Sequence, residues 1–293
     1  MSVSIVIRTH NEARHLPRLL EGIATQQVEG MPIETIVVDS GSDDGTIEIA
    51  CSFGCRLIHI PKSEFTFGRS LNLGCAAATG DYLVFVSGHC IPASKRWIHN
   101  IVQPLAAGIA AYSYGRQIGD DSSRFSECQL FRKYYPESSR IPTDDFFCNN
   151  ANAALLRSVW DQHRFDEELT GLEDMELASR LVRKGMKIAY VADAPVLHLH
   201  EERWGRVRLR YEREAMALQR ILPQVHVSFF DFCRYFASAV FLDLQQALRT
   251  GVFTKHATDI VLFRLMQFWG SFRGNHEHRR LSREMKERYF YPT

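Results

Sequence analysis

The sequence has 293 residues, enough to bury a large core, and its length suggests one large domain or one domain with an appendage. With 45% hydrophobic and 24% charged residues it is not an intrinsically disordered chain. The net charge is only +1 but is uneven, because residues 1–200 hold 19 Lys and Arg against 24 Asp and Glu, while residues 201–293 hold 16 against 10. The basic C-terminal part indicates either an anionic partner surface or simply a solvated helix face.

Seven cysteines are scattered without CxxC pairs, which argues against a disulfide scaffold and for a reducing, cytoplasmic environment. The opening residues MSVSIVIRTHNE enter a strand at once, so we expect no secretory leader. No run of eighteen uncharged apolar residues occurs, and we therefore predict no membrane span.

Residues 1–200 alternate short β-branched runs with amphipathic helical stretches, the pattern of an α/β fold with a mostly parallel sheet covered by helices. We predict strands at 3–8, 34–40, 56–60 and 82–87. One helix contains apolar residues with helical spacing at Leu16, Leu19, Leu20 and Ile23. A second ends at Phe53 before Gly54, and a third begins near residue 68, with small residues that would allow close packing on the sheet.

The pattern weakens after residue 105. Residues 150–160 predict a strand or turn entering a helix, residues 172–185 a helix closed by Gly185, and residues 187–200 an extended segment. Residues 201–222 predict a helix charged nearly all round, as a bridging or exposed helix would be. Helices at 229–249 and 259–273 are amphipathic, and the second has its polar stripe at Arg264, Gln267 and Ser271. We place a domain boundary near residue 222, which leaves 223–293 as a helical extension.

Polar residues follow three of the predicted strands, where ligands of doubly wound sheets bind. They are Thr9, Asn11 and Glu12 after the first strand, Asp39 and Ser40 after the second, and Ser87, Gly88 and His89 after the fourth. The chain has neither a GxGxxG motif nor a P-loop, so bound phosphates would need an arginine, such as Arg69, and a metal ion.

Four segments resemble, in order, the motifs of the family 2 glycosyltransferases of the GT-A fold: SIVIRTHNEARHLPRLLEGI, ETIVVDSGSDDGTIEIA, GRSLNLGCAAATGDYLVFVSGHCIP and FDEELTGLEDMELASRLVRKG. The resemblance covers roughly residues 3–215. It implies a GT-A type, doubly wound, mixed and mostly parallel sheet flanked by helices, with residues 1–222 as the nucleotide-sugar-binding and catalytic domain. It also implies transfer of a sugar, with inversion, from a nucleotide diphosphate donor to a glycan or lipid-linked acceptor.

By this resemblance, Thr9, Glu12 and Asp39 lie near the base and ribose, and Arg69 lies near the diphosphate. A carboxylate at a strand end can accept the imino hydrogen of uracil or thymine, which favours UDP- or dTDP-sugars. The alternative is that Asp39 and the SGSDDG loop are ordinary turn and capping residues.

In most of the family the fourth strand leads into a DxD-type motif that binds a divalent cation, but here Ser87, Gly88 and His89 occupy that place. Either imidazole replaces carboxylate as the ligand, which favours Mn²⁺ over Mg²⁺, or metal binding is lost. In an extended segment His198 and His200 point the same way, and the resemblance places a metal-binding histidine near them. We hypothesise a metal site at His89 with His198, His200 or both.

Asp174 matches the general base of the family, which takes the proton from the attacking acceptor hydroxyl. Its neighbour Glu173 is a second catalytic candidate, although its spacing from Thr170 is also that of a capping box. Asn149, Asn150 and Asn152 either contact a sugar or form an ordinary turn. A sugar nucleotidyltransferase and a non-catalytic nucleotide-sugar-binding scaffold are the alternatives to a transferase.

The two C-terminal amphipathic helices have wide aromatic faces that would pack together, form a homodimer or rest on a membrane at its cytoplasmic side. The flanking arginines are Arg264, Arg273, Arg279 and Arg280. We expect no nucleic-acid partner.

Overall fold

The computed structural model describes residues 1–28, 30–200, 202–276 and 289–290. The chain divides into two compact units. The first comprises Met1–Asp120, Tyr135–Leu169 and Glu173–Leu199, and the second comprises Asp121–Tyr134, Thr170–Leu172 and His200–Thr293. The chain passes from the first unit to the second after Leu199 and not near residue 222. The reason is that α8 (Trp204–Ile221) packs against α10 (Phe253–Asn275). An organisation into domains 1–222 and 223–293 stays a prediction.

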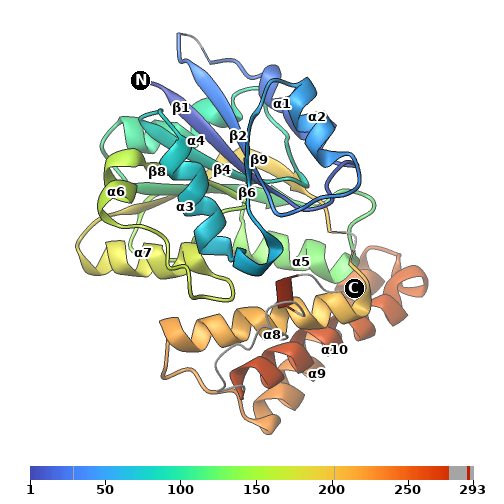
Figure 1. The fold of residues 1–293 in the computed structure, drawn as a ribbon. Coiled ribbons are helices and arrows are strands. Elements are labelled where there is room, and N and C mark those ends of the chain that lie inside the picture. Colours follow the sequence, from blue (N-terminus) through green and yellow to red (C-terminus); the bar gives the residue numbers. More distant parts are fainter. Residues whose placement is uncertain (29, 201, 277–288, 291–293) are drawn as a thin grey trace. The chain divides into compact units, whose positions relative to one another are not determined.

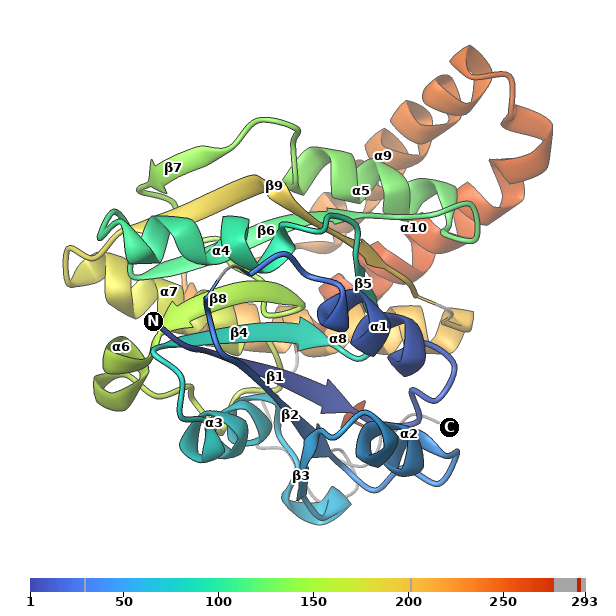
Figure 2. The same ribbon diagram turned by 90° about the horizontal axis from the view of Figure 1, so that it is seen from above.

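The first unit is built on one sheet of nine strands in the order β3-β2-β1-β4-β8-β6-β9-β5, with β7 paired to β9. The strands are β1 (Val3–Thr9), β2 (Ile33–Asp39), β3 (Arg56–His59), β4 (Tyr82–Ser87), β5 (Cys90–Pro92), β6 (Tyr112–Ile118), β7 (Arg140–Thr143), β8 (Asn152–Leu156) and β9 (Ile188–His198). Strands β1 to β4, β6 and β9 run one way, and β5, β7 and β8 run the other. The mixed, mostly parallel sheet expected from the sequence is confirmed, and Figure 2 shows β1, β4 and β8 side by side within it.

Helices cover both faces of this sheet because residues of each central strand alternate between the faces. Val3, Ile5 and Ile7 of β1 share one buried cluster with α1 (Leu16–Ala24) and α4 (Trp97–Ala106). Val6 faces the other way, against α3 (Phe67–Ala77). The remaining elements of the unit are α2 (Thr46–Ser52), the short 3-10 helix η1 (Lys62–Glu64), α6 (Arg157–Gln162) and α7 (Glu173–Arg183).

Close packing of α3 depends on Gly74. A Cβ atom at this position would collide with the side chain of Val6 and touch that of Val38. The prediction that small residues bring this helix close to the sheet is therefore confirmed.

The second unit contains α5 (Phe125–Tyr134), α8, α9 (Phe229–Arg249) and α10, and α10 packs against both α8 and α9 (Figure 1). Gly270 and Gly274 let the backbones of α10 and α8 approach, because a Cβ atom at either would collide with a carbonyl of α8. The charged helix, expected to be a bridging or an exposed one, has a buried face. Val207, Glu212, Ala217 and Ile221 of α8 are buried, since this helix has a face covered by α10.

The predicted polar stripe of the last helix is also inside rather than outside. Arg264 and Gln267 are buried, because the Arg264 guanidinium donates to both oxygens of the buried Asp243 on α9, at 2.7 and 3.0 Å. The aromatic faces of α9 and α10 do pack together, with Phe232 against the rings of Trp269 and Phe272. Arg279 and Arg280 lie outside the described residues. No helix in the described part of the chain is both long and apolar enough to cross a membrane.

Candidate active site

Three strands of the first unit end side by side. In the parallel register of β1 with β2, Thr9 is paired with Asp39, and in that of β1 with β4, Arg8 is paired with Ser87. The chain leaves β1 toward β2 on one side and reaches β4 on the other, so strand order reverses between β1 and β4. This is the position at which doubly wound sheets bind ligands.

Asp39 is completely buried and its carboxylate holds the following loop. One oxygen accepts from the Thr9 hydroxyl at 2.9 Å and from the Ser42 hydroxyl at 2.5 Å, and the other accepts from the N–H groups of Gly41 and Ser42 at 2.9 Å. The turn and capping role considered from the sequence is therefore present. Recognition of a nucleotide base by Asp39 stays a prediction.

Residues after β1 are tied to the loop after β2. Asn11 has a left-handed backbone, donates its N–H to the Ser42 hydroxyl at 2.8 Å and exchanges side-chain and backbone hydrogen bonds with Asp43 at 3.0 Å. The buried Ser40 donates its N–H and its hydroxyl to the carbonyl of Thr9. Thr9, Asn11, Asp39 and Ser40 are thus brought together as one rigid edge of the site.

Glu12 turns toward the end of β4 and contacts His89. Its Oε1 lies 2.7 Å from His89 Nδ1. Gly88 makes this contact possible, because a Cβ atom there would come within 2.8 Å of the Glu12 side chain and 3.2 Å of the Arg8 carbonyl. The Ser-Gly-His sequence therefore lets a carboxylate from β1 reach a ring from β4.

His198 ends β9 and lies beside His89. Antiparallel pairing of β5 with β9 sets His198 opposite Cys90, and the two imidazole rings stack with their centroids 5.1 Å apart. His198 Nδ1 lies 2.6 Å from Oε1 of the buried Gln117 on β6. The two Nε2 atoms face each other at 3.2 Å.

One tautomer of each ring fits these contacts. With its hydrogen on Nδ1, each ring donates to the Glu12 carboxylate or to the Gln117 oxygen, and a neutral ring then has its lone pair on Nε2. Two such nitrogens cannot hydrogen-bond to each other. The contact is favourable when a proton or a metal cation lies between them, and an acceptor on Nδ1 is the usual support of a metal-binding histidine.

His200 belongs to the second unit, and a carboxylate of that unit contacts its ring. Its Nδ1 lies 2.7 Å from Oε1 of the buried Glu127 on α5, which also accepts from Arg210 at 3.1 Å. Burial acts to raise the pKa of Glu127, but the charges and hydrogen bonds of His200 and Arg210 outweigh it and lower the pKa to about 2. Glu127 is therefore an anion that directs the Nδ1 hydrogen of His200 toward itself.

Glu173 and Asp174 begin α7 and are both buried. Glu173 accepts from the Arg8 guanidinium at 3.0 Å, and that guanidinium lies over the Phe67 ring. Arg8 is on β1 next to Thr9, so it connects the acidic pair to the strand ends. The capping-box alternative does not describe this carboxylate, which pairs with Arg8.

The pKa of Asp174 is raised well above the usual value of an aspartic acid. One oxygen accepts from the Asn150 N–H and the other from the Met175 N–H, both at 2.8 Å. Burial and the charge of Glu173 raise the pKa of Asp174 to about 7, although these hydrogen bonds and the charge of Arg8 act in the opposite direction. A carboxylate with this acidity suits proton transfer near neutral pH.

The three asparagines before β8 differ in their contacts. The Asn152 side chain accepts from the Trp97 indole N–H and donates to the carbonyls of Arg116 and Ala194, so its role is structural. Asn149 accepts from the Ala151 N–H. Asn150 accepts from the Tyr112 hydroxyl at 2.5 Å, while its buried Nδ2 has no hydrogen-bond partner among the described residues.

Arg69 pairs with acidic residues outside these clusters. It sits in the first turn of α3 and donates to Glu64 at 2.8 Å and to Glu167 at 3.5 Å. Its side chain is 41% exposed, so both ion pairs are accessible to solvent. A role near a diphosphate stays a prediction.

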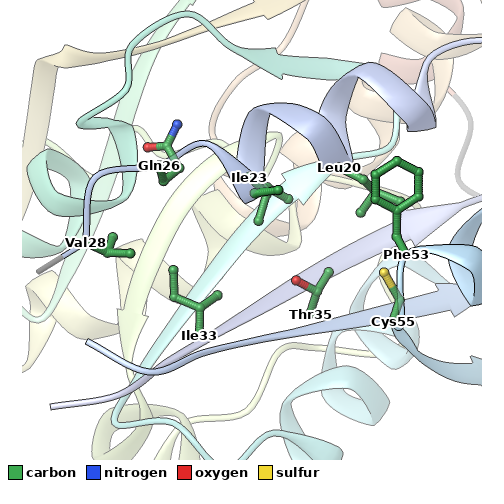
Figure 3. Close-up of a pocket in the computed structure, with 9 residues that line it drawn as sticks. Leu20, Ile23, Gln26, Val28, Ile33, Thr35, Phe53 and Cys55 are labelled. Carbon is green, nitrogen blue, oxygen red and sulfur yellow. The ribbon is translucent and has the colours of Figure 1, made fainter. Parts of the chain in front are cut away.

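A pocket of about 280 Å³ lies elsewhere in the unit, between α1, the start of β2 and the end of α2 (Figure 3). Its lining is largely apolar and includes Leu20, Ile23, Ile33 and Phe53. Ile33 is at the opposite end of β2 from Asp39, so this pocket is not part of the strand-end site.

Sequence reasoning missed Arg8 and Gln117 as members of the site. Arg8 left a signal, since it is a charged residue inside the apolar run VSIVIR. Gln117 left none, because its strand was not predicted.

Known proteins are similar to this chain in sequence. The family model for glycosyl transferase family 2 matches residues 4–164, more than half of the chain. The O-antigen chain rhamnosyltransferase RfbN of Salmonella typhimurium is 28% identical over 212 residues, which cover 68% of this chain and 67% of that protein. The O-antigen chain rhamnosyltransferase WbaN of Salmonella anatum is 30% identical over 188 residues, or 60% of each chain.

Solved structures share the fold. A mannosyltransferase from Pyrobaculum calidifontis, in complex with GDP-Man and Mn²⁺, superposes with a TM-score of 0.59 at 16% identity, over 91% of this chain and 87% of that one. Glucosyl-3-phosphoglycerate synthase from Mycobacterium tuberculosis, in complex with Mg²⁺ and UDP, has a TM-score of 0.56 at 20% identity, over 75% and 79%. The expected GT-A fold is confirmed, and the chain belongs to glycosyl transferase family 2.

Proposed function

We propose that this glycosyltransferase moves a sugar, with inversion, from a UDP- or dTDP-activated donor to a glycan or lipid-linked acceptor. The two Salmonella relatives are named as rhamnosyltransferases of the O-antigen chain, which supports a rhamnosyl donor and a growing polysaccharide as acceptor. Thr9, Asn11, Glu12, Asp39 and Ser40 would hold the nucleoside, with Ser87, Gly88 and Arg69 toward the diphosphate.

The facing Nε2 atoms of His89 and His198 carry the proposal that a divalent metal takes part. Their separation of 3.2 Å is that of two ligands about 2.1 Å from one ion and roughly 100° apart. Glu12 and Gln117 occupy the Nδ1 atoms, so the donor set fits a metal ion without rearrangement.

We propose His200 as a third ligand because it lies two residues beyond His198 in the chain. Imidazole ligands favour Mn²⁺ or another transition metal over Mg²⁺. A bound divalent ion would neutralise charge on the departing nucleoside diphosphate.

Asp174 would act as the general base. As the acceptor oxygen attacks the anomeric carbon, its proton passes to the Asp174 carboxylate, and the bond from that carbon to the diphosphate oxygen breaks with its electron pair on the diphosphate. The two backbone N–H groups hold this carboxylate in place, and the Arg8–Glu173 pair adjusts its acidity.

Asn150 would contact the acceptor or the transferred sugar. Its backbone positions Asp174, and its side-chain Nδ2 is a buried donor with no partner among the residues that the structure describes. A sugar hydroxyl is a suitable acceptor for such a group, because leaving a buried donor unpaired costs about 1–3 kcal/mol.

Lipid-linked acceptors would lie at the cytoplasmic face of a membrane. The seven scattered cysteines, without CxxC pairs, are in keeping with a reducing compartment. Residues 223–293 would supply the membrane contact, with a homodimer as their alternative use.

The function is tested by incubating the purified chain with dTDP-, UDP- and GDP-sugars and measuring release of the nucleoside diphosphate, with Mn²⁺ and with a chelator. We expect release from a dTDP- or UDP-sugar that is lost with chelator and restored by Mn²⁺. Equal release in both conditions would remove the metal from the proposal, whereas donor binding without any turnover would support a non-catalytic protein.

A further inference from the structure

The outer side of α9 carries exposed apolar residues. Within the second unit α9 is covered by α10, against which Phe232, Asp243 and Ala247 are buried (Figure 1). On the other side Phe230 is 75% exposed, Phe241 65% and Leu248 61%. Steps of eleven and seven residues put these side chains on one face of a helix, so they form a stripe rather than scattered exposures.

This outer face has cations but no exposed acid beyond the first turn of the helix. Asp243 is not exposed on this face, because both of its carboxylate oxygens accept from the buried Arg264 guanidinium. Asp231 is in the first turn, where it forms a capping box with Ser228. Arg234 and Arg249 are the charged side chains exposed on α9.

The distribution of charge decides between two possible occupants. Two copies of the chain related by a two-fold axis would bring the same arginine-bearing face against itself, with no exposed acid beyond the first turn to pair with it. An anionic lipid surface complements these arginines and accepts the apolar rings. Residues 201–293 carry 16 basic against 10 acidic residues, which adds to the attraction.

We propose that the outer face of α9, formed by Phe230, Arg234, Phe241, Leu248 and Arg249, docks in the plane of an anionic bilayer. Its aromatic and aliphatic side chains would enter the acyl boundary while the arginines remain at the phosphate level. This inference rests on the proposed function insofar as that function places the acceptor at a membrane. Docking itself requires no catalysis.

Flotation with lipid vesicles tests the proposal on the full chain. We expect binding to phosphatidylcholine vesicles that contain phosphatidylglycerol, and little binding to phosphatidylcholine alone. The double variant Phe230→Ser/Phe241→Ser should lower the partition constant at least tenfold, because both rings are exposed and contribute mainly to lipid contact. Arg234→Gln/Arg249→Gln should lower it by roughly an order of magnitude and remove most of its salt dependence.

Phe53→Ser, at an exposed phenylalanine of the first unit, is the matched control and should bind as the original chain does. Circular dichroism checks that the variants are folded, and release of nucleoside diphosphate from a soluble donor should be unchanged in them. Equal flotation of the original chain and Phe230→Ser/Phe241→Ser overturns the proposal. So does a lipid-free dimer, seen by sedimentation velocity, that this variant dissociates. Neither outcome depends on whether the donor reaction is found.

Discussion

His89 and His198 present their Nε2 atoms to each other at 3.2 Å while Glu12 and Gln117 occupy the two Nδ1 atoms. The sequence separates these histidines by 109 residues, and the pairing of β5 with β9 joins them. A proton or a cation is needed between two such lone pairs, and titration with metal distinguishes the two.

Removing one histidine should remove most of the metal affinity. We expect His89→Ala to weaken Mn²⁺ binding at least tenfold in calorimetry, and Gln117→Leu to weaken it by roughly 10- to 100-fold because the His198 ring loses its support. The exposed His99 supplies the control, since His99→Ala should bind Mn²⁺ normally. If His89→Ala and the original chain bind Mn²⁺ alike, the pair is not the metal site.

Asp174→Asn should separate binding from chemistry. We expect turnover to fall by roughly 10² to 10⁴, since an amide cannot take the acceptor proton, while nucleotide affinity remains nearly intact. Steady-state kinetics together with equilibrium titration of the nucleoside diphosphate measure both quantities. Unchanged turnover would end the assignment of Asp174 as base.

The pH profile of kcat/KM should report the pair around Asp174. The base works when deprotonated, so the rate should rise as pH increases through the pKa of about 7. The charge of Glu173 raises that pKa and the charge of Arg8 lowers it. Glu173→Gln should therefore move the rise to lower pH, and Arg8→Met should move it to higher pH. Shifts in the same direction would contradict this account.

Asn150→Ala should affect the acceptor side of the reaction. We expect kcat/KM for the acceptor to fall about tenfold through loss of one hydrogen bond, with donor hydrolysis retained because the backbone N–H still holds Asp174. Asn152→Ala is the comparison, and it should instead lower the melting temperature, since its amide binds the Trp97 indole of α4 and two carbonyls of the sheet. An Asn150→Ala enzyme with normal acceptor kinetics would remove this contact from the proposal.

Much of the fold could be predicted because its signals are local. The predicted strand at 82–87 and helix at 229–249 agree with β4 and α9 residue for residue, since hydrophobic spacing is read from neighbours in sequence. Strand β6 escaped prediction. Its sequence YSYGRQI carries Ser113 and Gln117, polar residues that are nonetheless buried in the middle of the sheet.

In the helical second unit, too, local spacing did not predict which polar residues are buried. Spacing marked Arg264 as an exposed polar residue, but Asp243 on the neighbouring helix draws it inside. No pattern within one helix can predict an ion pair formed with another.

The sequence by itself determined the alternation of strands and helices, the polar residues at the strand ends and the resemblance to a transferase family. Only the tertiary structure decided which of those polar groups meet: Glu12 with His89, His198 with Gln117, and Arg8 with Glu173 across 165 residues. The physical reason is that periodicity and turn chemistry act between neighbours in the chain, whereas the order and register of the strands determine which distant side chains share one buried edge of the sheet.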